Sequence, residues 1–123
     1  KDHYKTALVY GRHSFFSDEM PDSGGTDAGP GPSGFLATSL ASCTAITLRM
    51  YADRKGYDVE KIDVVVELTR KDERGITHSL FEQTISVTGN IGESEKKRLL
   101  EIADKCLIHK ALKGEITITS TIR

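Results

Sequence analysis

The feature that most constrains the fold is an uncharged stretch, residues 35–48, inside a longer segment, residues 31–56, that has the pattern of one helix. Pro32 suits the first helical turn, where its missing N–H costs nothing, and Gly56 suits the left-handed position just past the last turn. A helix with no charge on any face must be covered on all sides. The pattern therefore predicts a long helix at the centre of the core, with Cys43 in its buried part.

The composition is that of one ordinary globular domain. The sequence has 123 residues, 37% of them apolar and 28% charged, and a formal net charge of −1. Because acids and bases are interspersed, neither nucleic acid nor an anionic membrane is expected as a partner. We find no signal peptide or membrane span, and two cysteines without an export signal favour a reducing compartment. These observations predict one domain over residues 1–123 and a cytoplasmic location.

Alternating apolar and polar residues predict strands on both sides of this helix. Residues 18–31 form a glycine-rich loop that permits close backbone approach and lacks the ending of a P-loop. In the second half, Ile76 and Leu80 are out of phase with later apolar positions, which predicts a bulge near Leu80–Phe81. The predicted strands are residues 4–10 and 13–17, joined at Gly11–Arg12, then 62–69, a turn at 72–75, 76–88 and 116–122.

A second helix is predicted after residues 89–93. Ser94 is the expected N-cap, with Glu95 in the positive first turn. An apolar stripe at i, i+3, i+4 and i+7 runs from Leu99 to Cys106, so Cys106 is expected on the buried face of this helix, which ends at Gly114.

The order hairpin, long helix, two strands, helix, strand is typical of an α+β fold in which an antiparallel sheet packs on helices. So little remaining chain cannot cover the uncharged helix on every side. We expect a second copy of the protein to cover the rest of this helix, and we therefore predict a homodimer.

The two cysteines admit two interpretations. Each is either a small buried apolar residue, or the two form a redox pair in which one attacks an oxidant and the other resolves the product as a disulfide. Spacing alone does not decide between them. Two distant cysteines and His109 supply too few ligands for zinc. A serine triad is not indicated, because the sequence lacks a G-x-S-x-G elbow.

Three segments resemble the OsmC/Ohr family of organic hydroperoxide reductases. They are the loop at residues 24–32, the helix at 40–55 around Cys43, and the run at 101–112 around Cys106. Together they span nearly the whole chain. The resemblance implies an OsmC-like α+β fold, an intertwined homodimer with long central helices, and two active sites at the subunit interface.

The resemblance also implies roles for the cysteines. Cys43 matches the peroxidatic cysteine, whose thiolate attacks the O–O bond and becomes a sulfenic acid. Cys106 matches the resolving cysteine, which forms a disulfide with Cys43. An external dithiol, lipoyl-like in the best-known members, then reduces that disulfide. No metal, flavin or haem is implied.

A buried thiol normally has a raised pKa, so Cys43 needs a cation to become a thiolate. Cys43 lies about three turns into the helix, where the helix dipole has largely faded, so the cation must come from elsewhere. In the family this is an arginine from the N-terminal strands, and Arg12 is the arginine in that region; the alternative is a solvated turn residue. Family members usually hold that arginine with a glutamate early in the central helix. Here Ser33 and Gly34 occupy that region, and the acids that could substitute are Asp18, Glu19 and Asp27.

Two functions follow from these observations. The first is a thiol-dependent peroxidase that reduces organic hydroperoxides to alcohols, with Cys43, Cys106 and Arg12 as catalytic residues and an apolar pocket for the substrate. The second is a non-catalytic OsmC-like protein that binds an apolar small molecule or a partner at the dimer groove. The missing glutamate favours the second.

Overall fold

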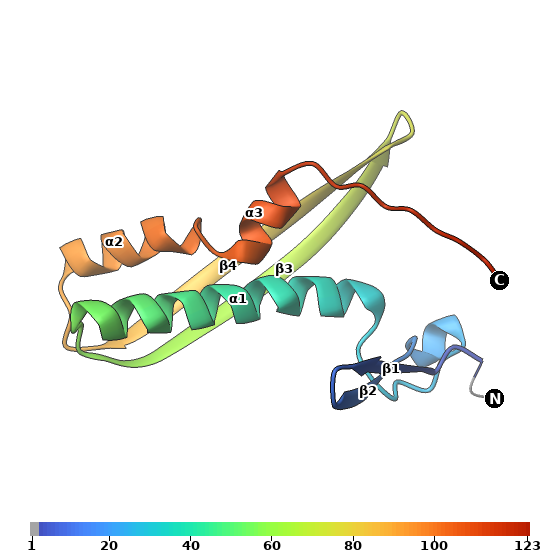
Figure 1. The fold of residues 1–123 in the computed structure, drawn as a ribbon, viewed down its shortest axis with the longest axis horizontal. Coiled ribbons are helices and arrows are strands. Elements are labelled where there is room, and N and C mark those ends of the chain that lie inside the picture. Colours follow the sequence, from blue (N-terminus) through green and yellow to red (C-terminus); the bar gives the residue numbers. More distant parts are fainter. Residues whose placement is uncertain (1–2) are drawn as a thin grey trace. The chain divides into compact units, whose positions relative to one another are not determined.

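The computed structural model describes residues 3–123 of the chain, which divide into an N-terminal unit ending at Thr38 and a second unit, Ser39–Arg123. Within these residues the fold is α+β, with three α-helices and two separate antiparallel sheets of two strands each (Figure 1). None of these helices has the length and hydropathy needed to cross a bilayer. The predicted α+β class, with antiparallel strands packed on a long helix, is confirmed, and within this chain the strands form two separate hairpins.

The N-terminal unit begins with the predicted hairpin. Strands β1 (Thr6–Tyr10) and β2 (His13–Ser17) pair antiparallel, with Tyr10 opposite His13. Gly11 and Arg12 form the turn, and Gly11 has a φ of 60°, a left-handed conformation that favours glycine. The predicted Gly-Arg turn is therefore confirmed.

The loop after β2 is built around the carboxylate of Asp18, which is 3% exposed. It accepts hydrogen bonds from the backbone N–H groups of Glu19 (2.8 Å), Thr26 (3.1 Å) and Ala28 (3.1 Å), and from the Thr26 hydroxyl (2.8 Å). The backbone N–H of Ala28, followed by the Thr26 hydroxyl and the other two N–H donors, outweighs desolvation and lowers the pKa of Asp18 from 3.8 to about 2. The loop also brings backbones together, since a Cβ at Gly25 would collide with the Glu19 carbonyl.

Replacing Asp18 with Asn is expected to loosen this loop. An amide offers one acceptor oxygen where the carboxylate offers two, and its NH₂ would face N–H donors. Hydrogen exchange should show faster exchange at the amides of Glu19, Thr26 and Ala28. In the wild type this contribution to stability is complete above about pH 4 and is lost as the pH falls through about 2. Asp22→Asn is the control, and equal protection in all three proteins would contradict the prediction.

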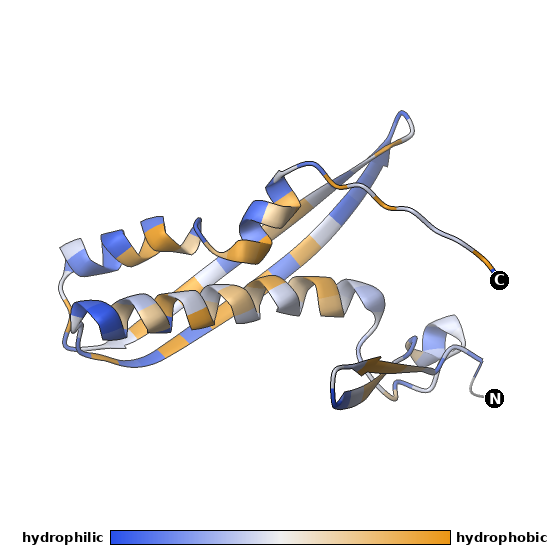
Figure 2. Ribbon diagram, in the orientation of Figure 1, coloured by the Kyte–Doolittle hydropathy of each residue, from blue (hydrophilic) through white to orange (hydrophobic). Residues whose placement is uncertain are grey.

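The central helix is confirmed as α1 (Pro32–Lys55), with Gly56 following it at a φ of 72°. Its N-terminal end is reached by Phe15, whose ring centroid lies 5.5 Å from that of Phe35. Only one side of the helix is fully covered. The buried side is formed by Ala37, Leu40, Thr44, Leu48, Tyr51 and Ala52. Exposed apolar residues on the remaining surface include Ile46 (53%) and Met50 (63%), and Figure 2 shows hydrophobic and near-neutral residues alternating along the middle of α1 and a strongly hydrophilic C-terminal end.

Strands β3 (Val59–Glu73) and β4 (Ile76–Gly89) form a long hairpin that projects beyond the helices of its unit (Figure 1). The turn is confined to Arg74–Gly75, so the predicted turn at 72–75 is too wide. The bulge predicted near Leu80–Phe81 is wrong. The register is continuous there, with Leu68 opposite Phe81, and the irregularity lies between Val59 and Lys61 instead.

The phase change that suggested a bulge has a simpler cause. Ile76 and Leu80 lie on the opposite face of β4 from Phe81, and that face is exposed in this chain. The other face of the hairpin supplies Ile62, Ile85 and Val87 to the core. A regular strand carries apolar residues on both faces when each face meets a different neighbour.

Helix α2 (Glu93–Ala103) begins two positions earlier than predicted. Gly92 is its N-cap, and its N–H donates to Glu95 Oε1 at 3.0 Å, so the predicted Ser94 cap is wrong. The helix also ends before Cys106. The N–H groups of Asp104, Lys105 and Cys106 bond the carbonyls three residues back, which tightens the last turn.

Cys106 is therefore not part of α2 but the N-cap of a third helix, α3 (Leu107–Lys113). Its backbone is extended, with a φ of −68° and a ψ of 148°. The predicted burial is confirmed, because Cys106 is 1% exposed. The prediction of one continuous helix through Cys106 is wrong, because α2 ends at Ala103 and Cys106 has an extended backbone before α3.

The core of the second unit lies between α1, α2 and one face of the β3–β4 hairpin. Its fully buried centre consists of Leu48, Tyr51, Leu99, Ile102 and Ala103, against which Tyr57, Ile62, Ile85, Val87 and Ile91 pack. This cluster holds α1 through Leu48 and Tyr51, about one to two turns beyond Cys43.

The last predicted strand, residues 116–122, is absent as a strand, and this prediction is wrong for a single chain. The segment pairs with no strand of the described chain, and Ile116, Ile118 and Ile122 are 62%, 83% and 98% exposed. Alternation makes a segment suited to a sheet, but a strand also needs a neighbour for its backbone hydrogen bonds.

Candidate active site at the start of helix α3

The second unit brings the two cysteines together although 63 residues separate them in sequence. Cys43 lies in the middle of α1, and Cys106 lies at the junction between α2 and α3. Both are free thiols, and they lie close enough that each one shifts the pKa of the other. The spacing of the two cysteines in sequence could not show that they are close. The packing of α1 against the C-terminal helices brings them together.

The surroundings of Cys43 favour its negatively charged thiolate form. Its sulfur is half-buried and accepts a hydrogen bond from the backbone N–H of Ile108 at 3.5 Å. Burial by itself raises the pKa of Cys43. Hydrogen bonds from the N–H of Ile108, the thiol of Cys106, the N–H of Leu107 and the hydroxyl of Thr47 together outweigh burial, so the pKa of Cys43 is lowered.

The surroundings of Cys106 favour its neutral, protonated thiol form. Its burial raises the pKa of the thiol, and although the N–H of His109 donates to its sulfur at 3.3 Å, the hydrogen bond that Cys106 gives to Cys43 raises the pKa further. The two thiols therefore differ in the direction that the predicted roles require. The less buried one tends toward thiolate, and the more buried one holds its proton.

Two polar residues beside the cysteines were not singled out from the sequence. The hydroxyl of Thr44, which is fully buried, lies 2.8 Å from Gln83 Oε1 and 3.9 Å from the Cys106 sulfur. Gln83 reaches this point from β4, where it occupies an inward position between apolar residues. A glutamine on the apolar face of a strand was the signal in the sequence that could have revealed this contact.

The backbone N–H groups of Leu107 and Ile108 were also missed. The sequence argument sought a cation for Cys43, because the dipole of α1 has faded three turns into the helix. The structure provides amide donors from the first turn of α3 instead. Only the end of α2 before Cys106 places these groups there, and the helical stripe in the sequence hid that break.

Arg12 lies elsewhere in the chain. It is exposed in the β1–β2 turn and belongs to the N-terminal unit, whereas both cysteines belong to the second unit. Its assignment as the cation beside Cys43 stays a prediction. Asp18 does not fit the role of the missing helix glutamate, since four donors of its own loop occupy its carboxylate. The first turn of α1 carries no acidic residue.

Metal ligands do not gather in this region. Among residues 3–123, no group of three or more His, Cys, Asp or Glu side chains could hold a metal ion. His109 contributes its backbone N–H to the site, and its imidazole faces Asp104 at 3.9 Å.

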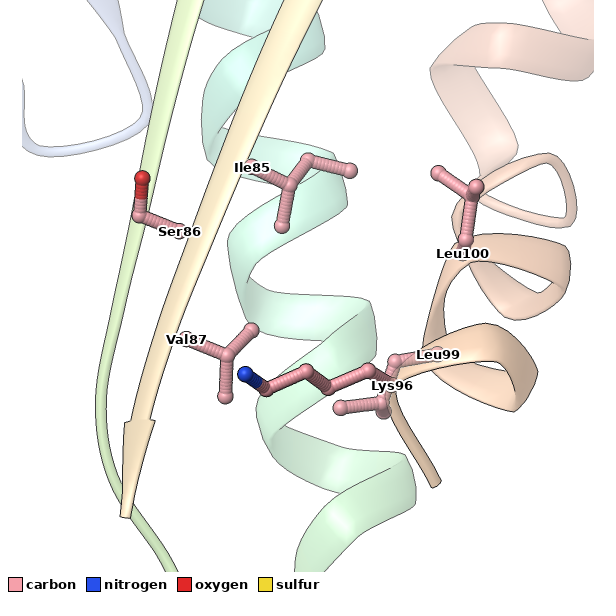
Figure 3. A pocket seen from close by; sticks show the side chains of 6 residues that line it. All are labelled: Ile85, Ser86, Val87, Lys96, Leu99 and Leu100. Atoms are coloured by element: carbon pink, nitrogen blue, oxygen red, sulfur yellow. The ribbon is translucent and has the colours of Figure 1, made fainter. Parts of the chain in front are cut away.

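A hollow of about 370 Å³ lies between β4 and α2 (Figure 3). Its walls are mainly apolar, with Lys96 reaching across it. The lining residues are Ile85, Ser86, Val87, Lys96, Leu99 and Leu100. Neither cysteine lines this hollow, so it is not the substrate pocket predicted beside Cys43.

Comparison with solved structures shows the same fold in several bacterial proteins. An OsmC-like protein from Mycoplasma pneumoniae has a TM-score of 0.78 at 20% identity, covering 89% of this chain and 79% of that one. An organic hydroperoxide resistance protein OsmC from Legionella pneumophila has a TM-score of 0.68 at 17% identity, covering 91% and 90%. The organic hydroperoxide resistance protein OhrB of Bacillus subtilis has a TM-score of 0.61 at 20% identity, covering 89% of each chain.

The sequence itself gives the family. No curated protein matches the chain. The family described as OsmC-like protein, however, matches residues 24–121, a span that includes α1, both long strands and both cysteines. The resemblance noted in the sequence is thereby confirmed, and the chain belongs to the OsmC-like protein family.

Proposed function

We propose that the protein is a thiol-dependent peroxidase that reduces organic hydroperoxides to alcohols. The observation that carries this proposal is the proximity of two unlike free thiols: Cys43 is half-buried and accepts the backbone N–H of Ile108, whereas Cys106 is buried, and the pKa is lowered for Cys43 and raised for Cys106. A peroxidatic cysteine must be a thiolate, and a resolving cysteine must wait until a sulfenic acid has formed. The organic hydroperoxide resistance proteins of similar fold support the same substrate class.

The chemistry runs in three steps. The Cys43 thiolate attacks one oxygen of the hydroperoxide, the O–O bond breaks, and the alkoxide leaves as the alcohol after taking a proton. Cys43 is then a sulfenic acid. The Cys106 sulfur attacks the Cys43 sulfur, its proton joins the departing hydroxide, and water and a disulfide result. An external dithiol, lipoyl-like in chemistry, reduces the disulfide and becomes oxidised in turn. The cytoplasm is a reducing compartment suited to this cycle.

Titration of free thiols before and after one equivalent of cumene hydroperoxide tests the proposal. The peroxidase loses both thiols, and a dithiol such as dihydrolipoamide restores them. Retention of both thiols while the hydroperoxide persists would contradict it. The second candidate would then apply, an OsmC-like protein that binds an apolar molecule at a dimer groove. The first turn of α1, which lacks an acidic residue, favours that candidate.

The proposed active form is a single-domain homodimer, because one chain leaves apolar surface uncovered on α1 and along residues 116–122. Analytical ultracentrifugation at micromolar concentration should therefore show a dimer. Ile46→Glu places a charge on the uncovered side of α1 and is expected to shift the protein toward monomer. Ile46→Val keeps the surface apolar and should remain dimeric. A wild-type monomer with a cooperative unfolding transition would rule out this assembly.

Arg12 is the proposed cation that assists Cys43 in the assembled protein. Replacing Arg12 with Ala is expected to raise the pKa of Cys43 by about 1–3 units, since a nearby positive charge favours the thiolate. The pH dependence of the rate of alkylation by iodoacetamide measures this shift. Arg74, another exposed arginine in a hairpin turn, provides the matched control Arg74→Ala. Identical titration of wild type and Arg12→Ala would make Arg12 a bystander.

A further inference from the structure

We propose that Thr44 and Gln83 control the second half of this reaction: the Thr44 hydroxyl is held by Gln83 in the resting protein and turns to stabilise the Cys106 sulfur when that sulfur becomes the nucleophile. This inference rests on the proposed peroxidase function. It assigns to both residues a positioning role, since neither one exchanges bonds with the substrate.

The geometry of Thr44 supplies the first argument. A hydroxyl has one hydrogen, and Thr44 Oγ1 has two acceptors within reach, Gln83 Oε1 at 2.8 Å and Cys106 Sγ at 3.9 Å. The first distance is ideal for an O–H···O hydrogen bond, and the second is long even for sulfur. In the reduced protein the hydrogen therefore points to Gln83, and the Cys106 thiol is left free to donate to Cys43.

Burial supplies the second argument. Thr44 is 0% exposed and Cys106 is 1% exposed, so water cannot stabilise a negative charge that develops on the Cys106 sulfur. Negative charge develops on the Cys106 sulfur to the extent that its proton leaves before the bond to the Cys43 sulfur is complete. The N–H of His109 is already aimed at this sulfur at 3.3 Å and is fixed by the backbone. The Thr44 hydroxyl is a second donor within reach, and it can rotate.

Gln83 permits the change without leaving a buried group unpaired. A carboxamide carries both an acceptor oxygen and a donor NH₂. When the Thr44 hydrogen turns to sulfur, a rotated Gln83 amide can donate to the Thr44 oxygen. A switchable partner also explains why the resolving thiol can remain protonated at rest and still gain a stabilising donor later.

Thr47 gives an internal comparison on the same helix. Its hydroxyl helps to lower the pKa of Cys43, whereas Thr44 contacts Cys106. The two threonines are three positions apart on α1, and each serves a different sulfur. Removing one hydroxyl should therefore affect one half-reaction, and removing the other should affect the other half.

The test is single-turnover kinetics with cumene hydroperoxide, in which hydroperoxide loss reports the first step and disulfide closure reports the second. Thr44→Val is expected to slow closure about tenfold relative to the first step, as expected for loss of one hydrogen bond to a charged group. Closure should also require higher pH in this variant. Thr44→Ser keeps the hydroxyl and should restore closure. Thr47→Val should show the opposite pattern, with a slower first step.

Gln83→Leu is the second variant, and it tests the direction of the effect. Without the Gln83 carboxamide, Cys106 Sγ is the remaining side-chain acceptor shown for the Thr44 hydroxyl among residues 3–123, so closure should be at least as fast as in the wild type. The inference is overturned if Thr44→Val closes at the wild-type rate, if Thr44→Ser fails to restore closure, or if Gln83→Leu is slowed like Thr44→Val. A wild type that forms no disulfide at all would instead contradict the peroxidase function itself.

Discussion

Replacing Cys43 with Ser is expected to abolish hydroperoxide consumption completely. The hydroxyl of serine stays protonated at neutral pH and is a far weaker nucleophile than a thiolate. Cys43 is the half-buried cysteine and the one whose pKa is lowered, so no other group of the pair can replace it in the first step. Hydroperoxide loss measured under excess dithiol gives the result directly.

Replacing Cys106 with Ser should give a different outcome. The first oxidation of Cys43 proceeds, but the sulfenic acid finds no thiol partner and is exposed to further oxidation to sulfinic and sulfonic acids. Intact mass spectrometry after stoichiometric oxidant separates the cases. Wild type should lose two hydrogens, about 2 Da, as the disulfide forms, whereas Cys106→Ser should gain oxygen. A Cys43→Ser protein that consumes hydroperoxide at the wild-type rate would show that the assignment of Cys43 is wrong.

The second large effect is expected in the core. Leu99 is 1% exposed and belongs to the cluster that joins α2 to α1. Leu99→Ala removes buried apolar surface and leaves a cavity, with an expected loss of about 2–5 kcal/mol in the free energy of unfolding. This is a large share of the roughly 5–15 kcal/mol that stabilises a typical domain. Urea denaturation measures it.

The adjacent residue offers a matched control. Leu100 has the same side chain in the same helix but is 64% exposed, so Leu100→Ala should change the free energy of unfolding by about 0.5 kcal/mol or less. Equal losses at the two positions would show that the core is not organised as described. The comparison also bears on the site, since the same cluster holds the helix that carries Cys43.

Local chemistry explains why the sequence predicted α1 so closely. Pro32 and Gly56 are residues whose own backbone preferences start and stop a helix, so no tertiary information is needed. The β1–β2 turn followed from a glycine in the same way. Helices and turns whose ends are determined by the backbone preference of a single residue are the ones that the sequence predicts well.

Cys106 shows the limit of this reasoning. Its burial followed from an apolar stripe, but the stripe continues through a break in the helix that no glycine or proline marks. The break turns the N–H groups of Leu107 and Ile108 toward Cys43, and so the main donors to that sulfur could not be foreseen. The contact between Thr44 and Gln83 depends on the pairing of α1 with β4, across 39 residues of sequence.

The prediction of a strand at residues 116–122 was wrong for a different reason. Its alternation describes what the segment can do in a sheet, but strand formation depends on a neighbour that the single chain does not provide. The bulge at Val59/Lys61 was likewise invisible, because it reflects where β3 meets Gly89 at the far end of the hairpin.

The position of Cys106 at the cap of α3 has a consequence for the oxidised protein. The sulfur that accepts the N–H of His109, and so anchors the first turn of α3, is the sulfur that would enter the proposed disulfide. A helix of seven residues has little stability of its own, so it depends on such an anchor. Oxidation redirects this sulfur toward Cys43 and weakens its hold on the helix. In the proposed oxidised form we therefore expect α3 to open more readily, which would give a dithiol reductant access to the disulfide.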